Sequence, residues 1–215
     1  MRYENLLILG AGLCGRSARE IAQHMGCFEK MGFLDDNIME MPDGTKILGT
    51  LNKFENFANE YSNIFVAIAN PKIKLNLLNK IKETTPYRIV TLISPNAYIS
   101  PSAQIMQGSM IEAMAVINTG SVISTGCIIG AGSIVNHSSM CCDGVHMECR
   151  ATVADNTLVP AGTEIKSGEI FKRNTIEVGD LFFDTEKSPG NANNAKKPHG
   201  PLPVNGLDYC FEDGM

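Results

Sequence analysis

The sequence lacks the features that mark several large classes of protein. No apolar run is long enough to span a bilayer, and the formal net charge of −5 argues against a nucleic-acid partner. The seven cysteines are an odd number without the spacing of a disulfide framework. The N-terminus, MRYENLLILGAG, lacks the basic region and cleavage site of a signal peptide. We therefore expect a cytoplasmic protein that binds neither nucleic acid nor membrane.

What the sequence does have is a six-residue period that runs from Ala97 to about Asp180. The third place of each hexad is usually branched, the first place is usually small, and no insertion breaks the period. A fixed short period predicts a parallel β-helix in which each hexad forms one flat face, three hexads form a triangular coil, and neighbouring coils lie ~4.8 Å apart. A β-sandwich would instead show turns of varied length. The inward, third-place residues would be Ile99, Ile105, Ile111, Ile117, Ile123, Ile129, Val135, Cys141, Met147, Val153, Val159, Ile165 and Phe171.

The pattern changes sharply near residue 95, which divides the chain into parts. We expect an α/β domain over residues 1–92, a β-helix over residues 93–180 and an irregular tail over residues 181–215. The tail is rich in Pro, Gly, Asn and charge, and it cannot bury enough apolar surface to fold alone. It would either wrap a neighbouring subunit or remain disordered.

The N-terminal domain opens with an apolar strand, a glycine-rich turn and a helix. In the turn, Gly10, Gly12 and Gly15 would allow a phosphate to approach free N–H groups at the start of the helix. Asp35 and Asp36 follow about 20 residues later, where a ribose is read in dinucleotide sites. A nicotinamide cofactor is one interpretation, but the domain is too short for both halves of a dinucleotide fold. A second alternative is that the glycines serve only tight packing.

The order of these parts resembles one family over about residues 4–165. A short α/β domain with GAGLCG and GFLDD, a proline turn at residues 94–96 and then hexads is similar to the bacterial hexapeptide-repeat sugar acetyltransferases. These enzymes acetylate nucleotide-linked amino sugars or sialic acids. The resemblance implies a Rossmann-like α/β domain followed by a left-handed parallel β-helix, an exception to the right-handed crossover rule. It also implies acetyl-CoA bound along the β-helix between the subunits of a homotrimer. The small outward residues of a triangular prism would let the subunits pack side by side.

The same resemblance implies roles for the N-terminal residues. The three glycines of the turn would face the phosphates of the sugar nucleotide. Asp35 and Asp36 would contact uridine, and Ala69 and Asn70 would close the pocket.

Two of the four histidines stand nine positions apart, as in this family's catalytic segment. In NHSSMCCDGVHM, His137 falls on the general base, which would take a proton from the sugar amine or hydroxyl as it attacks the thioester. A neutral imidazole suits that task. His146 falls on the residue that positions the pantetheine arm. The structural alternative for His137 is a turn histidine bonded to the backbone.

Several positions depart from the family. Asn136 and Ser138 replace acidic neighbours that assist the base, so the imidazolium loses a stabilising charge unless Asp143 or Glu148 supplies one. The segment I-N-T-G lies two hexads early, the coils after the second histidine are fewer, and the closing G-x-P-A segment is missing. The sequence therefore leaves two interpretations: an active acetyltransferase, or a non-catalytic relative that keeps sugar-nucleotide binding.

A rival constellation of cysteine and histidine lies in the same stretch and could bind zinc tetrahedrally. Cys141 and Met147, however, occupy inward places, where cysteine behaves as a small hydrophobe. We therefore expect no metal. The members of this constellation are His137, Cys141, Cys142, His146 and Cys149.

Overall fold

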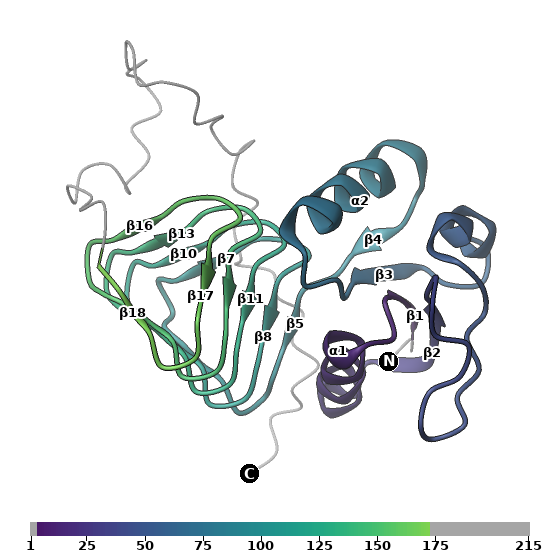
Figure 1. The fold of residues 1–215 in the computed structure, drawn as a ribbon, viewed down its shortest axis with the longest axis horizontal. Coiled ribbons are helices and arrows are strands. Elements are labelled where there is room, and N and C mark those ends of the chain that lie inside the picture. Colours follow the sequence, from purple (N-terminus) through teal and green to yellow (C-terminus); the bar gives the residue numbers. More distant parts are fainter. Residues whose placement is uncertain (1–3, 173–215) are drawn as a thin grey trace.

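The computed structural model describes residues 4–172, which form an α/β domain beside a β-helix (Figure 1). The last predicted hexads, over residues 173–180, and the predicted tail lie outside the described residues. Of the helices within residues 4–172, none is long and apolar enough to cross a membrane.

The N-terminal domain is a four-stranded parallel sheet in the order β2-β1-β3-β4. Helix α1 covers one face, packing against Leu6 and Ile8, while α2 and the 3₁₀ helix η1 cover the other face, packing against Leu7 and Leu9. A strand buried on both sides needs apolar residues on both, which explains the unbroken run NLLIL. The elements are β1 (Glu4–Leu9), α1 (Leu13–Met25), β2 (Phe28–Leu34), η1 (Leu51–Phe57), β3 (Asn63–Val66), α2 (Pro71–Thr84) and β4 (Arg88–Ile89).

The second part is the predicted left-handed β-helix, built from strands of two residues in three parallel sheets. Viewed along its axis it is a triangular prism (Figure 1). Face 1 holds β5 (Leu92–Ile93), β8 (Met110–Ile111), β11 (Ile128–Ile129), β14 (His146–Met147) and β17 (Glu164–Ile165). Face 2 holds β6 (Tyr98–Ile99), β9 (Val116–Ile117), β12 (Ile134–Val135), β15 (Thr152–Val153) and β18 (Ile170–Phe171). Face 3 holds β7 (Gln104–Ile105), β10 (Val122–Ile123), β13 (Met140–Cys141) and β16 (Leu158–Val159).

The interior of the prism matches the predicted third places. Every third-place residue from Ile105 to Ile165 is buried in one core, and Ile99 and Phe171 pack against its two ends. From Gly108 to Gly168 the sixth place turns each corner with positive φ, usually at glycine but also at Met114, Ser138, Arg150 and Asn156.

The small first-place residues lie inside the prism as well, so the expectation that small outward residues form the packing surface is wrong. Ser121, Ser133 and Ser139 are buried at corners. Each hydroxyl donates to the carbonyl oxygen fifteen positions further on, at 2.7–2.8 Å. The tight corner leaves room for a small side chain, and the hydroxyl is satisfied without water.

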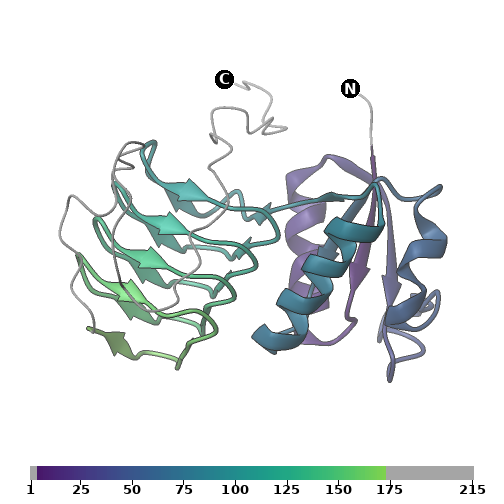
Figure 2. The same ribbon diagram turned by 90° about the horizontal axis from the view of Figure 1, so that it is seen from above.

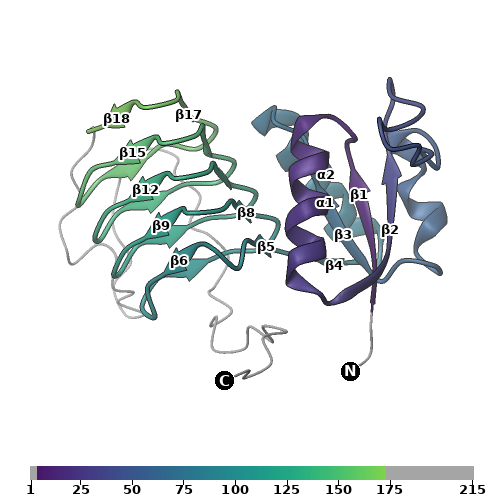
Figure 3. The ribbon, with the colours of Figure 1, turned by 90° about the horizontal axis from the view of Figure 1, so that it is seen from below.

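Face 1 is the side of the prism that packs against the N-terminal domain (Figures 2 and 3). Its outward residues Leu92, Met110 and Ile128 are at most 2% exposed, because they share a core with α1 and the sheet. Helix α2 lies along the adjacent corner, where Leu75 and Leu78 approach the glycines of successive coils. The two parts are therefore joined by a continuous apolar core.

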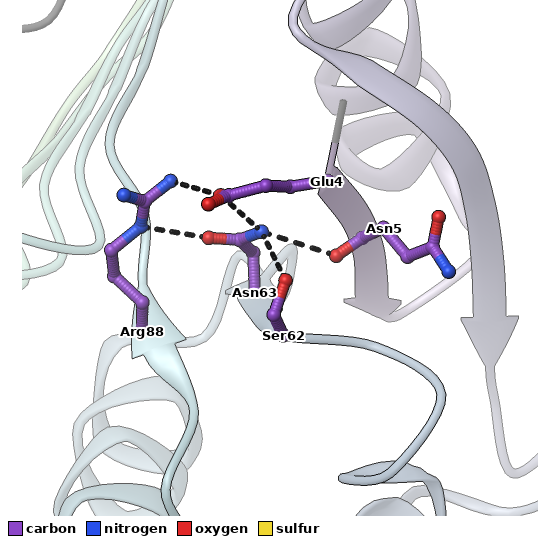
Figure 4. Close-up of polar contacts among 5 residues, drawn as sticks. All are labelled: Glu4, Asn5, Ser62, Asn63 and Arg88. Carbon is purple, nitrogen blue, oxygen red and sulfur yellow. Dashed lines mark hydrogen bonds and ion pairs between the residues drawn. The ribbon is translucent and has the colours of Figure 1, made fainter. Parts of the chain in front are cut away.

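The amino ends of three strands are tied by one buried amide (Figure 4). Asn63 of β3 is fully buried, and its Nδ2 donates to Glu4 Oε2 at 2.9 Å, to the carbonyl oxygen of Asn5 at 3.2 Å and to Ser62 Oγ at 3.0 Å. Arg88 of β4 donates to Asn63 Oδ1 at 2.8 Å and pairs with Glu4. Since this edge is opposite to the glycine turn, the network stabilises the sheet and stands apart from the candidate site.

Asn63→Ala should lower the free energy of unfolding by about 1–3 kcal/mol, because it leaves buried hydrogen-bonding groups without partners. The control Lys30→Gln removes the ion pair between two exposed side chains, Lys30 and Glu60, that lie outside this network, so its cost should stay below about 1 kcal/mol. Urea unfolding of both variants measures the difference. Equal costs would show that the buried amide is not the group that ties the strands.

Candidate active site

The glycine turn follows β1 at the carboxyl edge of the sheet, and its three glycines are not equivalent. A Cβ on Gly10 would lie 2.7 Å from the carbonyl oxygen of Ala67, and one on Gly15 would lie 2.0 Å from that of Gly10. Gly10 also has φ of +105°. These two glycines are required for packing. A Cβ on Gly12 meets nothing within 4 Å, so only this glycine borders open space.

The start of α1 has the features of an anion site. Its N-cap, Gly12, offers no side-chain cap, and no acidic residue lies in the first turn. Arg16, in that turn, has a buried Nε without a partner, and its guanidinium makes no hydrogen bond or ion pair with the residues that the structure describes. Free N–H groups, the helix dipole and an unpaired cation together favour a phosphate. Arg16 was not singled out from the sequence, although its place in the first turn after the glycines is the signal.

Asp35 accepts three backbone N–H groups and Asp36 accepts one. Burial raises the pKa of Asp35, but N–H donors from Ala11, Asn37 and Ile38 outweigh it and hold the pKa below its usual range. Asp36 accepts the N–H of Leu51 through Oδ1 at 2.9 Å. The bond from Ala11 to Asp35 fixes the glycine turn against the loop after β2. Asp36 alone keeps a carboxylate oxygen without a partner among the described residues.

Asn70 begins α2, and its Oδ1 accepts the N–H of Ile73 at 3.1 Å. This side chain therefore caps the second helix that points its N-terminus toward the carboxyl edge of the sheet.

His146 lies on β14 of face 1, in the same outward column as Met110 and Ile128 but one coil beyond the apolar interface. It is partly buried. Burial, and then the positive charge of Lys74, lower its pKa. A neutral ring at pH 7 suits a hydrogen-bonding role toward a ligand.

His137 lies elsewhere, in the turn between β12 and β13 where faces 2 and 3 meet. This corner is opposite to face 1 and points away from the N-terminal domain (Figure 1). The ring is exposed and makes no hydrogen bond with residues 4–172. The backbone carbonyl accepts from the N–H of Asn156 at 2.9 Å and from Ser139 Oγ at 3.2 Å. Within one chain, the structure brings His146 near the N-terminal domain and keeps His137 on the far side.

A family model and several solved structures match this chain. The family described as the PglD N-terminal domain matches residues 5–81. The acetyltransferase domain of PglB from Neisseria gonorrhoeae FA1090 has 30% identity and a TM-score of 0.72 over 78% of this chain and 82% of that chain. Its complex with acetyl coenzyme A gives 30% identity and a TM-score of 0.74 over 79% and 82%. PerB from Caulobacter crescentus, in complex with CoA and GDP-perosamine, shares the fold at 20% identity and a TM-score of 0.52 over 78% and 91%. The curated proteins contain no match.

The chain belongs to the hexapeptide-repeat sugar acetyltransferases. Both the predicted family and the predicted fold are confirmed. The roles of individual residues stay predictions, to which the geometry adds constraints.

The two carboxylates suggested as substitutes for the family's acidic neighbours lie at other corners than His137. Asp143 accepts the N–H of Thr125 at 3.1 Å, and burial raises its pKa. Glu148 accepts the hydroxyl and N–H of Ser167 and pairs with Lys166; these contacts, in that order, lower its pKa to about 2. Neither carboxylate is at the corner that carries the proposed base of this acetyltransferase.

The rival zinc constellation is spread over the prism. Cys141 is fully buried in the interior, whereas Cys149 is exposed at the corner after β14. Within the part of the chain that the structure describes, no three His, Cys, Asp or Glu side chains are grouped to hold a metal ion.

Lys74 is a buried charge that the sequence analysis did not single out. It lies on α2, fully buried at the corner of the prism, and its Nζ donates to the carbonyl oxygen of Gly126 at 3.0 Å. Burial lowers its pKa to about 8. The signal was present in the sequence, because Lys74 stands four and seven residues before the buried Leu78 and Ile81 and thus on the apolar stripe of the helix.

Lys74→Met should stabilise the fold in a pH-dependent way. The folded-state pKa of about 8 lies below the ordinary value of 10.5, so the unfolded chain binds more protons between these two pH values. The stability contributed by wild-type Lys74 therefore rises with pH in this window, by roughly 3 kcal/mol in all. The advantage of the methionine variant should be largest below pH 8 and fade toward pH 10.5.

Urea unfolding of wild type and variant at intervals between pH 7 and pH 10.5 gives the difference at each pH. Lys72→Met, at an exposed position of the same helix, should show no such trend. A difference between Lys74→Met and wild type that does not change with pH would contradict the buried charge.

Proposed function

We propose that this protein transfers the acetyl group of acetyl-CoA to an amino or hydroxyl group of a nucleotide-linked sugar or sialic acid, with His137 as general base. The observation that carries the proposal is the 30% identity, over most of both chains, to a domain whose structure holds acetyl coenzyme A. The GDP-perosamine bound by PerB, a protein of the same fold, supports a sugar nucleotide as the acceptor.

The sugar nucleotide would bind at the carboxyl edge of the N-terminal sheet. Its phosphates would lie against Gly12 and the uncapped start of α1, where Arg16 supplies positive charge. The free oxygen of Asp36 would accept a hydrogen bond from the base or the ribose. In this proposal four residues act indirectly, because they shape the loops and the helix end that surround the ligand: Gly10, Gly15, Asp35 and Asn70. Two of the three glycines would then serve tight packing, as in the packing alternative.

His137 would act on the acceptor. Its neutral ring accepts the proton of the amine or hydroxyl while the acceptor atom attacks the thioester carbonyl of acetyl-CoA. The tetrahedral intermediate then collapses, the C–S bond breaks, and the CoA thiolate leaves and takes up a proton. His146, neutral at pH 7, would hold the pantetheine arm.

Two copies of the chain are needed for these groups to meet, and we propose a homotrimer with its threefold axis along the coils. The support is the position of His137 at the corner opposite to face 1, combined with the rigid apolar junction between face 1 and the N-terminal domain. The base of one subunit would then serve the nucleotide bound to its neighbour. The outward places of face 2 offer apolar surface for the contact: Tyr98, Val116, Ile134 and Ile170.

The alternative is a non-catalytic relative that binds sugar nucleotides only. It is favoured by the absence of a carboxylate next to His137 in the sequence. The release of free thiol from acetyl-CoA, with UDP- and CMP-linked amino sugars as acceptors, separates the two functions. Binding of a sugar nucleotide without thiol release would favour the alternative.

His137→Ala should lower kcat about 10²–10⁴-fold, the contribution of a positioned general base, and leave the affinities for both substrates nearly unchanged. Thiol release measures the rate, and calorimetry measures the binding. His24→Ala removes an exposed histidine at the end of α1 and should have wild-type rates. Wild-type turnover in His137→Ala would exclude this histidine as the base.

Mixed trimers test whether the site is shared between subunits. Gly12→Val should weaken sugar-nucleotide binding, because its side chain fills the only open space among the glycines, while acetyl-CoA binding stays intact. When Gly12→Val and His137→Ala subunits are dissociated and reassembled in equal amounts, about one quarter of the sites should regain both wild-type groups.

Light scattering should give a trimer for each protein, and thiol release after mixing should reach about a quarter of the wild-type rate. If mixed trimers form but remain inactive, each site belongs to a single chain. If only monomers are found at micromolar concentration, the shared site is excluded.

A further inference from the structure

The corner that carries His137 repeats along the prism with a spacing of eighteen residues. Face 2 pairs Val135 with Val153, and face 3 pairs Met140 with Leu158, so both sides of the corner have the same offset. The residue stacked on His137 in the next coil is therefore Asp155. The N–H of Asn156 donates to the carbonyl oxygen of His137 at 2.9 Å, which fixes the two turns against each other.

Asp155 is the only carboxylate that the structure describes at this corner. The coil below places Asn118 and Thr119 under Asn136 and His137, and the coil below that has Ser100 and Pro101 there. On the two faces that meet at the corner, the outward places hold neutral side chains, of which Tyr98, two coils below, is titratable. Lys172, one coil above Asp155 and two above His137, is the described cation of this corner.

The Asp155 carboxylate is free to turn toward the ring. The side chain is exposed, forms no ion pair with residues 4–172, and accepts only from the side-chain amide of its neighbour Asn156, at 3.5 Å. Stacked residues of neighbouring coils are separated by the strand spacing of ~4.8 Å. A histidine ring and a carboxylate on such residues reach hydrogen-bond distance by rotation of their side chains alone.

A histidine that acts as a base needs a partner for its second nitrogen. A carboxylate there fixes the tautomer that leaves the other nitrogen unprotonated, orients the ring, and stabilises the imidazolium once the proton has moved. We propose that Asp155, from the next coil, is this positioning residue for His137. The inference rests on the proposed role of His137 as the base. The residues next to His137 in the sequence supply no carboxylate, and in this proposal the next coil supplies one.

Asp155→Asn should lower kcat about tenfold with little change in KM, because the lost contact is strongest when the ring is protonated. The acid limb of the pH profile of kcat should move to lower pH. Asp155→Glu should restore most of the rate. Ser138→Asp in the Asp155→Asn background should also recover activity, because it returns a carboxylate to the same corner at a residue that already has φ of +53°. Glu169→Gln removes an exposed carboxylate from another corner and should leave rate and profile unchanged.

A double-mutant cycle separates this role from a purely structural one. In the His137→Ala background, Asp155→Asn should have no further effect on the residual rate, since Asp155 acts through the ring. The same tenfold loss in both backgrounds would overturn the proposal, as would wild-type kinetics for Asp155→Asn. If His137→Ala itself has wild-type activity, the proposed function fails first.

A measurement without turnover completes the test. The ring nitrogen signals of His137, followed by NMR in the unliganded protein, should show one dominant tautomer in wild type and a mixture of both tautomers in Asp155→Asn, because the carboxylate fixes the tautomer. Glu169→Gln should leave the tautomer unchanged. The same tautomer populations in wild type and Asp155→Asn, together with an unchanged kcat, would overturn the proposal whether or not the acceptor sugar has been found.

Discussion

The hydrogen-bond ladder between successive coils is the constraint on which the rest of the structure depends. Each coil repeats after eighteen residues, and every face is held to the next coil by parallel pairs such as Val122 with Met140 and Ile128 with His146. Because the ladder allows no slip, a residue's place in the hexad decides whether it points inward, outward or into a corner. A single insertion would move every later side chain, so the spacing is as much a functional requirement as a structural one.

The same ladder places apolar and polar residues in one outward column of face 1. Along one outward column, Leu92, Met110 and Ile128 are buried against the N-terminal domain, and His146 and Glu164 continue the column beyond it. The apolar part of the column fixes the domain, and the polar part then lies near the N-terminal end of α2, where Pro71 approaches Gly144 and Gly162. Burial at this junction also explains why the pKa of His146 and that of Lys74 are both lowered.

The sequence was sufficient for the repeat, the inward residues and the glycine turn, because each follows from a local pattern. A period of six cannot say which of three faces meets the N-terminal domain, since all three have the same inward residues. It also could not show that first-place serines point inside, or that Asp35 binds the N–H of Ala11, because these contacts join residues far apart in the chain. The sequence could not point to Asp155 as a neighbour of His137 for the same reason. The two residues are distant in sequence and adjacent only through the register of the coils.

The rigid junction between the two parts limits how this chain can work. Residues of α1, the sheet and face 1 form one core, so the N-terminal domain cannot swing around the prism to reach the corner between faces 2 and 3 without exposing that core to water. The glycine turn after β1 and the exposed His137 are thus held on opposite sides of a single chain. If both take part in one reaction, as we propose, the second copy supplies the missing half of the site, and the outward residues of the prism that set the packing of subunits also set the distance between base and substrate.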